Sequence, residues 1–381
     1  MHRGVRPRPP DAVHPPLRAP LPEPRLRLTT REAESERRAT ERDRIIVIGA
    51  GVIGASVAHH LARAGHDVIV LDSRTPGAGV TAASFAWVGM AKSPADAYAG
   101  SVRQRARPEF DRVLTELTAP IGLRPFGAVT WEESEDLTRA FVADHQAAGH
   151  RMELLTAREV LMREPGLRDA PDVVAYAPDD VGIDPVAYTR ALLQSAQEHG
   201  AEVRTGTTVL RVLSDGGGVR GVLTDRGELE AKSVVVAAGT ASVGIAASAG
   251  VDIDVVGSPC CLLRFSTPRP LVRGILSTPE LEVRQLDDTT LLAAEDVPEG
   301  FLGDPRELAV ATLAAIRSSF VDAEDVRLEH AVIADRPIPA GDRPLVGPVP
   351  AMPGLHLAIA HPGVILSAEI GRVVAADHTL L

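Results

Sequence analysis

The regular part of the sequence opens with the stretch IIVIGAGVIG, residues 45–54. Its first four residues are an unbroken β-branched run, which is typical of a strand buried on both faces of a parallel sheet. Three glycines follow, and helical apolar spacing then continues from residue 52 to Gly65, a residue that commonly ends helices. A second apolar run covers residues 67–71. The stretch therefore predicts a strand, a glycine turn, a helix and a second strand.

The three glycines meet separate requirements of dinucleotide binding. Gly49 permits the tight turn, Gly51 lets a pyrophosphate approach the backbone, and Gly54 lets helix and strand pack closely. The phosphates then meet unpaired N–H groups and the positive end of the helix dipole at Val52. Asp72 closes the second strand at the spacing of a carboxylate that binds ribose hydroxyls. The unit predicts a bound dinucleotide, but it does not separate FAD from a nicotinamide nucleotide.

Composition excludes several classes of protein. Residues 1–43 are rich in Arg and Pro without a sustained apolar pattern, so we expect a disordered tail, or a wrongly assigned translation start. The first 44 residues hold 11 Lys+Arg and 7 Asp+Glu, which leaves 29 against 44 in the remainder, a net charge near −15. A body this acidic argues against a nucleic-acid binder. No apolar run reaches the length of a membrane span.

Cysteine usage indicates a reducing compartment. The two cysteines, Cys260 and Cys261, are adjacent, so they cannot form a disulfide framework, and we expect a cytoplasmic protein. We interpret them as small apolar side chains in or near a strand. No Cys/His cluster has the spacing of a metal site, and no Gly-X-Ser-X-Gly elbow indicates a hydrolase.

The remaining pattern alternates strands and helices. Asp184 is expected to cap a helix that has Pro185 in its first turn and ends before Gly200. Further strands are predicted at residues 202–212, 219–225, 232–238 and 281–286, and a final helix at residues 364–376.

Three later segments carry a family resemblance. The first is GAGVTAASFAW (residues 77–87). The second begins with GIDP (182–185) and continues with GAEV (200–203), TV (208–209) and VVAAG (235–239). The third is DRPIPAGDRPLVG (335–347) with HPGVIL (361–366). On these segments the chain from Ile45 onward resembles the D-amino acid oxidase-like FAD-dependent oxidoreductases, which include glycine and sarcosine oxidases. The resemblance implies FAD as the cofactor. It also implies noncovalent binding, because the cysteine motif through which some sarcosine oxidases hold flavin is absent.

The resemblance also implies how FAD would be held. Thr81 and Ser84 would contact phosphate, and the backbone at Val209 would hydrogen-bond adenine. Backbone N–H groups near Gly363 would approach the pyrimidine end of the flavin, where a helix N-terminus stabilises the negative charge of the reduced ring. The predicted cofactor-binding residues are Gly49, Gly51, Val52, Ile53, Gly54, Asp72, Ser73, Arg74, Thr81, Ala82, Ala83, Ser84, Val209, Ala238, Gly239, Arg336, Gly363, Val364, Ile365 and Leu366.

Four residues are candidates for the substrate side. Arg336 falls where amino-acid-oxidising relatives carry the arginine that binds the substrate carboxylate, a task suited to a planar guanidinium; the alternative is an ion pair with a neighbour such as Asp335. Arg284 is a second cation candidate. Glu282 would suit a cationic amine, in a region where some relatives place a tyrosine. His361 would lie near the flavin, or would be an ordinary histidine of a polar loop.

Together these features predict a two-domain α/β flavoprotein. A doubly wound Rossmann-type FAD domain (residues 44–90, 176–256 and 334–381) would be interrupted by a substrate domain with an antiparallel sheet (91–175 and 257–333). The expected reaction oxidises the C–N bond of an amino acid or related amine by hydride transfer to flavin N5, giving an imine, with O2 or a redox partner as electron acceptor. The alternatives are a dehydrogenase serving a partner subunit or quinone, a flavin-binding subunit without its own substrate site, and a nicotinamide dehydrogenase.

Removing residues 1–40 is expected to leave flavin content and melting temperature almost unchanged, because the segment carries no core pattern. Absorption spectra and thermal melts of the truncated and full-length proteins test this. A large drop in melting temperature would mean that the tail docks on the body.

Overall fold

The computed structural model describes residues 43–91 and 99–379. The predicted tail lies outside the described residues except for Asp43. Among the helices of the described chain, none combines the length and apolar character needed to cross a membrane.

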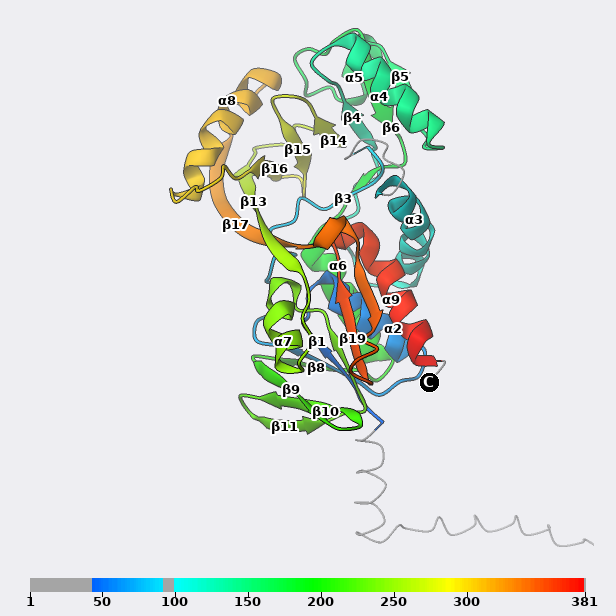
Figure 1. Ribbon diagram of the computed structural model, residues 1–381. Coiled ribbons are helices and arrows are strands. Elements are labelled where there is room, and N and C mark those ends of the chain that lie inside the picture. Colours follow the sequence, from blue (N-terminus) through cyan, green and yellow to red (C-terminus); the bar gives the residue numbers. More distant parts are fainter. Residues whose placement is uncertain (1–42, 92–98, 380–381) are drawn as a thin grey trace, which may run out of the picture. The chain divides into compact units, whose positions relative to one another are not determined.

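A six-stranded sheet carries the glycine turn (Figure 1). Its strands are parallel except for the first, which runs antiparallel to its neighbour. In spatial order they are β18 (Leu345–Pro348), β19 (Leu355–Ile359), β12 (Ser233–Val236), β1 (Ile45–Ile48), β2 (Val68–Asp72) and β8 (Glu202–Thr205). The predicted first unit of strand, turn, helix and strand is confirmed.

Both faces of this sheet are covered, as the unbroken apolar strands require. Side chains alternate along β1, so Ile45 and Val47 join the apolar cluster under the helices, while Ile46 and Ile48 join a second cluster on the opposite face. The helical layer consists of α2 (Val52–Arg63), α3 (Ala99–Glu116), α6 (Pro185–Glu198) and α9 (Gly363–Thr379).

Local capping explains where α6 begins. The Asp184 carboxylate accepts hydrogen bonds from the N–H groups of Val186 and Ala187, with Pro185 in the first turn, so the predicted cap is confirmed. The final helix starts one residue before its predicted first residue and continues to Thr379.

The opposite face is covered by a three-stranded sheet and by α7 (Ser242–Ser248). The small sheet contains β9 (Val209–Asp215), β10 (Gly218–Thr224) and β11 (Gly227–Glu230). The prediction of one strand over residues 202–212 is wrong: β8 ends at Thr205 and β9 belongs to another sheet. Gly206, with φ of +61°, turns the chain between them.

An eight-stranded sheet forms the second large layer (Figure 1). Its pairs are antiparallel except that β14 and β4 are parallel. In spatial order the strands are β17 (Arg327–Pro339), β13 (Val255–Ser266), β16 (Thr290–Asp296), β15 (Glu282–Gln285), β14 (Ile275–Ser277), β4 (Ala128–Thr130), β6 (Val174–Ala177) and β5 (Glu153–Leu155). Apolar side chains of α8 (Ala309–Ser319) share one core cluster with this sheet.

Shorter elements complete the described chain. They are β3 (Trp87–Val88) paired with β7 (Val181–Gly182), α4 (Glu135–Ala147), α5 (Ala157–Arg163), and the 3-10 turns η1 (Gly239–Ala241), η2 (Pro305–Leu308) and η3 (Ala340–Asp342). The α/β class is as predicted. The predicted domain boundaries stay a prediction.

Buried histidines are expected to make the fold sensitive to acid. Burial is the main reason why the pKa of His59 falls to about 3 and that of His356 to about 4. The unfolded chain binds these protons below about pH 6.5 whereas the folded chain does not, so stability present above that pH is lost as pH falls toward the folded values. Each histidine removes up to about 1.4 kcal/mol of unfolding free energy per pH unit. The melting temperature should fall between about pH 7 and about pH 5; a constant value would contradict this reasoning.

Candidate functional site

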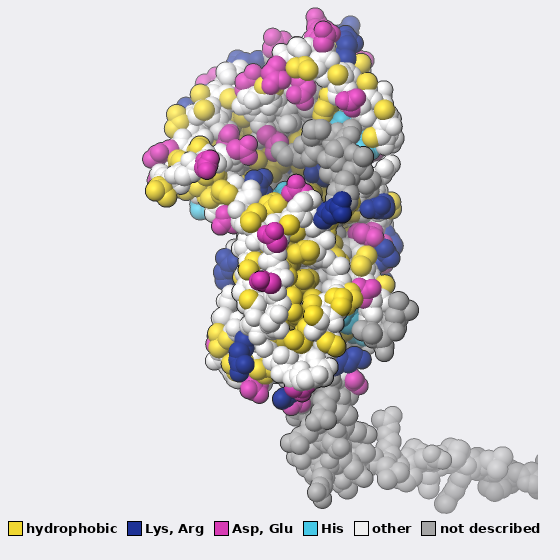
Figure 2. Space-filling view, viewed as in Figure 1, with side chains coloured by type: hydrophobic (Ala, Val, Ile, Leu, Met, Phe, Trp, Pro, Cys, Tyr) yellow, Lys and Arg dark blue, Asp and Glu magenta, His cyan; other side chains and the backbone are white. Residues whose placement is uncertain are grey.

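A cavity of about 1360 Å³ lies where the carboxyl ends of β1, β2 and β12 face β13 and β17. The space-filling view shows the surface hollowed below α8, with basic and histidine side chains in the recess (Figure 2). Most of the predicted site residues line this cavity: Gly49, Gly51, Val52, Ile53, Asp72, Ser73, Arg74, Thr81, Ala82, Ala83, Ser84, Val209, Ala238, Gly239, Glu282, Arg336, His361, Gly363, Val364 and Ile365. Gly54, Arg284 and Leu366 do not line it.

The geometry of the glycine turn fits a bound pyrophosphate. Gly49 has φ of +107°, and a Cβ there would lie 2.4 Å from the carbonyl oxygen of Ala237. A Cβ on Gly54 would lie 1.9 Å from the Gly49 carbonyl oxygen, so this residue lets α2 pack on the turn. A Cβ on Gly51 would have only the Thr81 hydroxyl, at 3.4 Å, as its nearest neighbour. Gly51 therefore faces open cavity, where a phosphate needs the backbone to be accessible.

Asp72 is held in place by the turn itself. Its Oδ2 accepts the N–H of Ala50 and its Oδ1 accepts the N–H of Arg74, both at 2.7 Å. A carboxylate has about four lone-pair positions. Both oxygens therefore keep capacity to accept hydrogen bonds from a ribose in the cavity.

The loop after β2 passes over the start of α2. The Thr81 hydroxyl accepts the N–H of Val52 at 3.2 Å, so it lies at the helix N-terminus where phosphate was expected. The Ser84 hydroxyl instead accepts the N–H of Ala86 at 3.1 Å and supports its own loop. The two hydroxyls thus have different surroundings, and only that of Thr81 reaches the helix N-terminus.

A second helix N-terminus faces the same cavity. Helix α9 begins at Gly363, whose position lies against the side chains of Ile53 and Val52 at the start of α2. Its first residues Gly363, Val364 and Ile365 line the cavity. Two positive dipole ends therefore converge on one space, which favours an anionic ligand. Leu366 is buried and does not line the cavity, so the cavity-lining residues of α9 end at Ile365.

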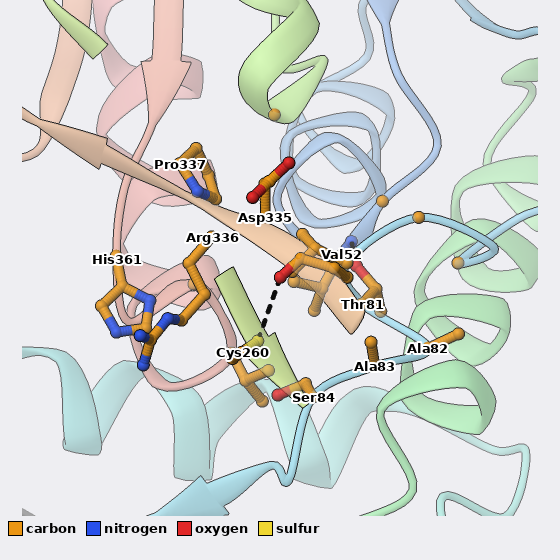
Figure 3. Close-up of a pocket in the computed structure, with 18 of the residues that line it drawn as sticks. Val52, Thr81, Ala82, Ala83, Ser84, Cys260, Asp335, Arg336, Pro337 and His361 are labelled. Atoms are coloured by element: carbon orange, nitrogen blue, oxygen red, sulfur yellow. Dashed lines mark hydrogen bonds between the residues drawn. The ribbon is translucent and has the colours of Figure 1, made fainter. Parts of the chain in front are cut away.

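Arg336 projects from β17 toward the end of the cavity that is lined by Cys260, Ser84 and His361 (Figure 3). Its Nη2 donates to the Ser258 hydroxyl at 2.9 Å, and its Nε lies 3.4 Å from the Ser258 carbonyl oxygen. Within the described chain, no carboxylate pairs with Arg336 and no acceptor binds its Nη1. The alternative of an ion pair with Asp335 is therefore not seen among these residues.

Glu282 and His361 enter the cavity from different elements. Glu282 begins β15 and is half-buried on the cavity side of the eight-stranded sheet. His361 lies in the loop before α9, and Figure 3 shows its ring pointing toward the same part of the cavity as Arg336. The structure thus places a carboxylate and an imidazole in the same cavity as the guanidinium.

The structure corrects the prediction for Arg284. Its side chain is fully buried, its Nη2 donates to the Ile183 carbonyl oxygen at 2.7 Å, and its Nε donates to the Phe85 carbonyl oxygen. Burial lowers the pKa of its guanidinium to about 9. Arg284 lies on the cavity-facing side of β15, but the chain around Phe85 covers it. It therefore has no access to a substrate.

Both cysteines lie in β13 and are free. The Cys260 thiol donates to the Ala334 carbonyl oxygen at 3.3 Å (Figure 3), and burial raises its pKa. Burial also raises the pKa of Cys261, to about 11. Both are therefore protonated thiols at neutral pH and weak nucleophiles.

Sequence reasoning missed three basic residues of the cavity wall. Arg103 comes from α3, Arg264 from β13 and His330 from β17. Arg264 and His330 are cross-strand partners, and strand alternation places Arg264 on the same face as Cys260 and Leu262. Alternation along the predicted sheet could have indicated Arg264. No sequence signal indicates Arg103.

Comparison with known proteins identifies the family. The family model described as "DAO: FAD dependent oxidoreductase" matches residues 44–376. The chain is 32% identical over 270 residues to D-amino acid dehydrogenase of Cereibacter sphaeroides, covering 56% of this chain and 62% of that protein. It is 28% identical over 355 residues to glycine oxidase of Geobacillus kaustophilus, covering 88% of this chain and 93% of that protein.

A solved structure supports the fold. The crystal structure of glycine oxidase from Bacillus cereus superposes with a TM-score of 0.79 at 22% identity, covering 89% of this chain and 95% of that chain. The chain spans only about 62% of the length of the D-amino acid dehydrogenase that it matches. The family match confirms the predicted FAD cofactor, and the cavity has the glycine turn, the carboxylate and the helix N-termini that FAD requires. The chain belongs to the DAO family of FAD-dependent oxidoreductases.

Proposed function

We propose that this protein oxidises the C–N bond of an amino acid, whose carboxylate binds to Arg336. The names of its relatives support a reaction of this class, since they include glycine oxidase, D-amino acid dehydrogenase and 4-methylaminobutanoate oxidase. Each of these names describes a C–N substrate that also bears a carboxylate.

The proposal rests mainly on the hydrogen bonds of the Arg336 guanidinium. Ser258 orients the side chain through Nη2 and Nε, while Nη1 has no hydrogen-bond acceptor among the described residues. The donors of Nη1 in this half-buried cation are therefore open to a ligand that enters the cavity and accepts their hydrogen bonds. A substrate carboxylate would do so through charge-assisted hydrogen bonds.

The reaction needs little from the protein beyond positioning. Bound FAD would supply the hydride acceptor. A neutral amine that loses hydride from its carbon leaves an iminium ion, which water would hydrolyse to a carbonyl product and an ammonium or alkylammonium ion. Arg336 would fix the carboxylate end of the substrate, and the sheet face formed by β13, β16 and β17 would enclose the remainder. Holding the reacting carbon in place would increase the reaction rate, because it reduces the entropy cost of reaching the transition state.

Glu282 supports one competing substrate class. It lines the cavity from β15 and could pair with an ammonium group, as a plain amine substrate would require. The electron acceptor, either O2 or a redox partner, belongs to the same proposal. So do noncovalent FAD binding and a cytoplasmic location.

Product analysis tests the proposal. The purified protein is incubated with amino acids, N-methylated amino acids and plain amines, with an artificial electron acceptor, and the carbonyl product and released ammonia or methylamine are measured. We expect products from carboxylate-bearing substrates. Products from plain amines alone would favour the Glu282 alternative, and the absence of product throughout would refute C–N oxidation. Oxygen consumption in a parallel reaction without the artificial acceptor distinguishes an oxidase from a dehydrogenase.

A further inference from the structure

One wall of the cavity is an irregular segment, residues 85–91, that leads into and out of the short strand β3. Phe85, Ala86 and Trp87 line the cavity. Ala86 has φ of +54°, a left-handed conformation that costs a non-glycine residue free energy. A strained wall of this kind persists only if surrounding contacts fix it.

Asp180 supplies contacts at the far end of the segment. Its carboxylate is 2% exposed and lies between β6 and β7. Oδ2 accepts the indole N–H of Trp87 at 2.7 Å and the backbone N–H of Ala91 at 3.1 Å, while Oδ1 accepts the backbone N–H of Met90 at 3.0 Å. One buried carboxylate therefore binds a cavity-lining ring and two backbone groups beyond it.

The neighbouring backbone leaves space for the Asp180 carboxylate at Gly89. A Cβ on Gly89 would lie 2.0 Å from Cγ of Asp180, so only glycine leaves room for the carboxylate. Burying a carboxylate is expensive, and three donors offset part of that cost. A charge that served only to stabilise the core would be replaced by an apolar group at little loss. The three donors on this carboxylate instead fix the conformation of the segment that carries them.

The near end of the segment is held by Arg284. Its guanidinium donates to the carbonyl oxygen of Phe85 and, at 2.7 Å, to that of Ile183 on the other side of β7. Segment 85–91 thus has a buried guanidinium at its start and a buried carboxyl group at its end. Between them, the ring of Trp87 belongs to the same apolar cluster as Leu262, which lines the cavity from β13.

We propose that Asp180 is a positioning residue of the active site, which sets the place of the Trp87 indole in the wall against the flavin and its substrate. The proposal rests on the function proposed above. Asp180 would act through Trp87 and the backbone of segment 85–91, without touching the substrate. Loss of the carboxylate would let the indole move and change the space in which the amine meets the flavin.

A double-mutant cycle tests the coupling. Asp180→Ala and Gly89→Ala each break the same contact, the first by removing the carboxylate and the second by displacing it. Each is expected to slow anaerobic reduction of the flavin by the amine substrate at least about tenfold, with FAD still bound. Because the two substitutions remove the same interaction, flavin reduction in the double variant should be no slower than in the slower of the two single variants. Multiplied effects in the double variant would refute the coupling.

Two further variants separate positioning from general stability. Trp87→Phe removes the indole donor together with part of the ring but leaves the Asp180 contacts with Met90 and Ala91, and it should slow reduction by a smaller factor. Asp179→Ala is the matched control, since that neighbouring side chain is exposed and pairs with Arg151 at 3.2 Å; its reduction rate should equal that of the unchanged protein.

Visible circular dichroism of the bound flavin keeps this test independent of the substrate. Asp180→Ala and Gly89→Ala should change the sign or intensity of the flavin bands, and Asp179→Ala should not. If no amine reduces the flavin of the unchanged protein, the proposed function is refuted. The circular dichroism spectra still report whether Asp180 sets the position of Trp87. Unchanged flavin spectra and reduction rates, with only a lower melting temperature, would show that Asp180 stabilises the fold alone.

Discussion

Gly51→Val is expected to give a folded protein without bound FAD. Gly51 has φ of −73° and ψ of 177°, an extended conformation that valine adopts without strain. The nearest atom to its new Cβ would be the Thr81 hydroxyl at 3.4 Å, so the added methyl groups would enter the cavity beside the start of α2. They would occupy the space of the pyrophosphate and block its approach to the backbone N–H groups.

The measurement is the FAD released by acid precipitation per mole of protein. Gly216→Val is the matched control: that glycine lies in the turn between β9 and β10, does not line the cavity, and a Cβ there has no neighbour within 4 Å. It should retain full flavin content. Normal FAD content in Gly51→Val would show that the pyrophosphate does not lie at this turn.

Arg336→Ala is expected to weaken binding of a carboxylate-bearing substrate by about 2–5 kcal/mol, the range for truncating one partner of a buried ionic pair. That corresponds to roughly 30-fold to roughly 5,000-fold in Kd. Arg336→Lys should recover part of this, because an ammonium group supplies charge but lacks the planar donor pair. The Kd is taken from the substrate dependence of anaerobic flavin reduction.

Arg264 provides a control within the same cavity. It is another lining arginine without a carboxylate partner in the described chain, but six residues beyond Ser258 along β13. Arg264→Ala should leave the Kd of a small amino acid nearly unchanged.

A different result for Arg336→Ala would contradict this role. If that substitution weakened the binding of amines and of amino acids equally while the flavin spectrum stayed normal, Arg336 would order its loop or tune the flavin. The carboxylate-bearing substrate class would then be withdrawn in favour of a plain amine paired with Glu282.

The features that sequence predicted correctly are those set by local backbone rules. The turn at Gly49, which requires a positive φ, and the capped start of α6 at Asp184 depend on residues near them in the chain. Their outcome does not depend on which distant element packs nearby. The strand predicted over residues 202–212 failed because its apolar pattern continues through Gly206, where the backbone turns.

The features that sequence could not predict depend on what covers a side chain. Glu282 and Arg284 share one face of β15, yet Glu282 lines the cavity while Arg284 is covered by the chain around Phe85. Alternation assigns the face but carries no information about the segment packed on it. Asp180 was missed for the same reason, because its partners Trp87 and Met90 lie about ninety residues away in the chain.

Anaerobic titration of the bound flavin with a panel of amino acids and amines tests the central claim most directly. We expect a yellow protein whose visible flavin absorption is bleached by at least one carboxylate-bearing amine, with Arg336→Ala shifting that titration to higher concentration. A colourless protein that binds NADH, or a bound flavin that no member of the panel reduces, would contradict this claim.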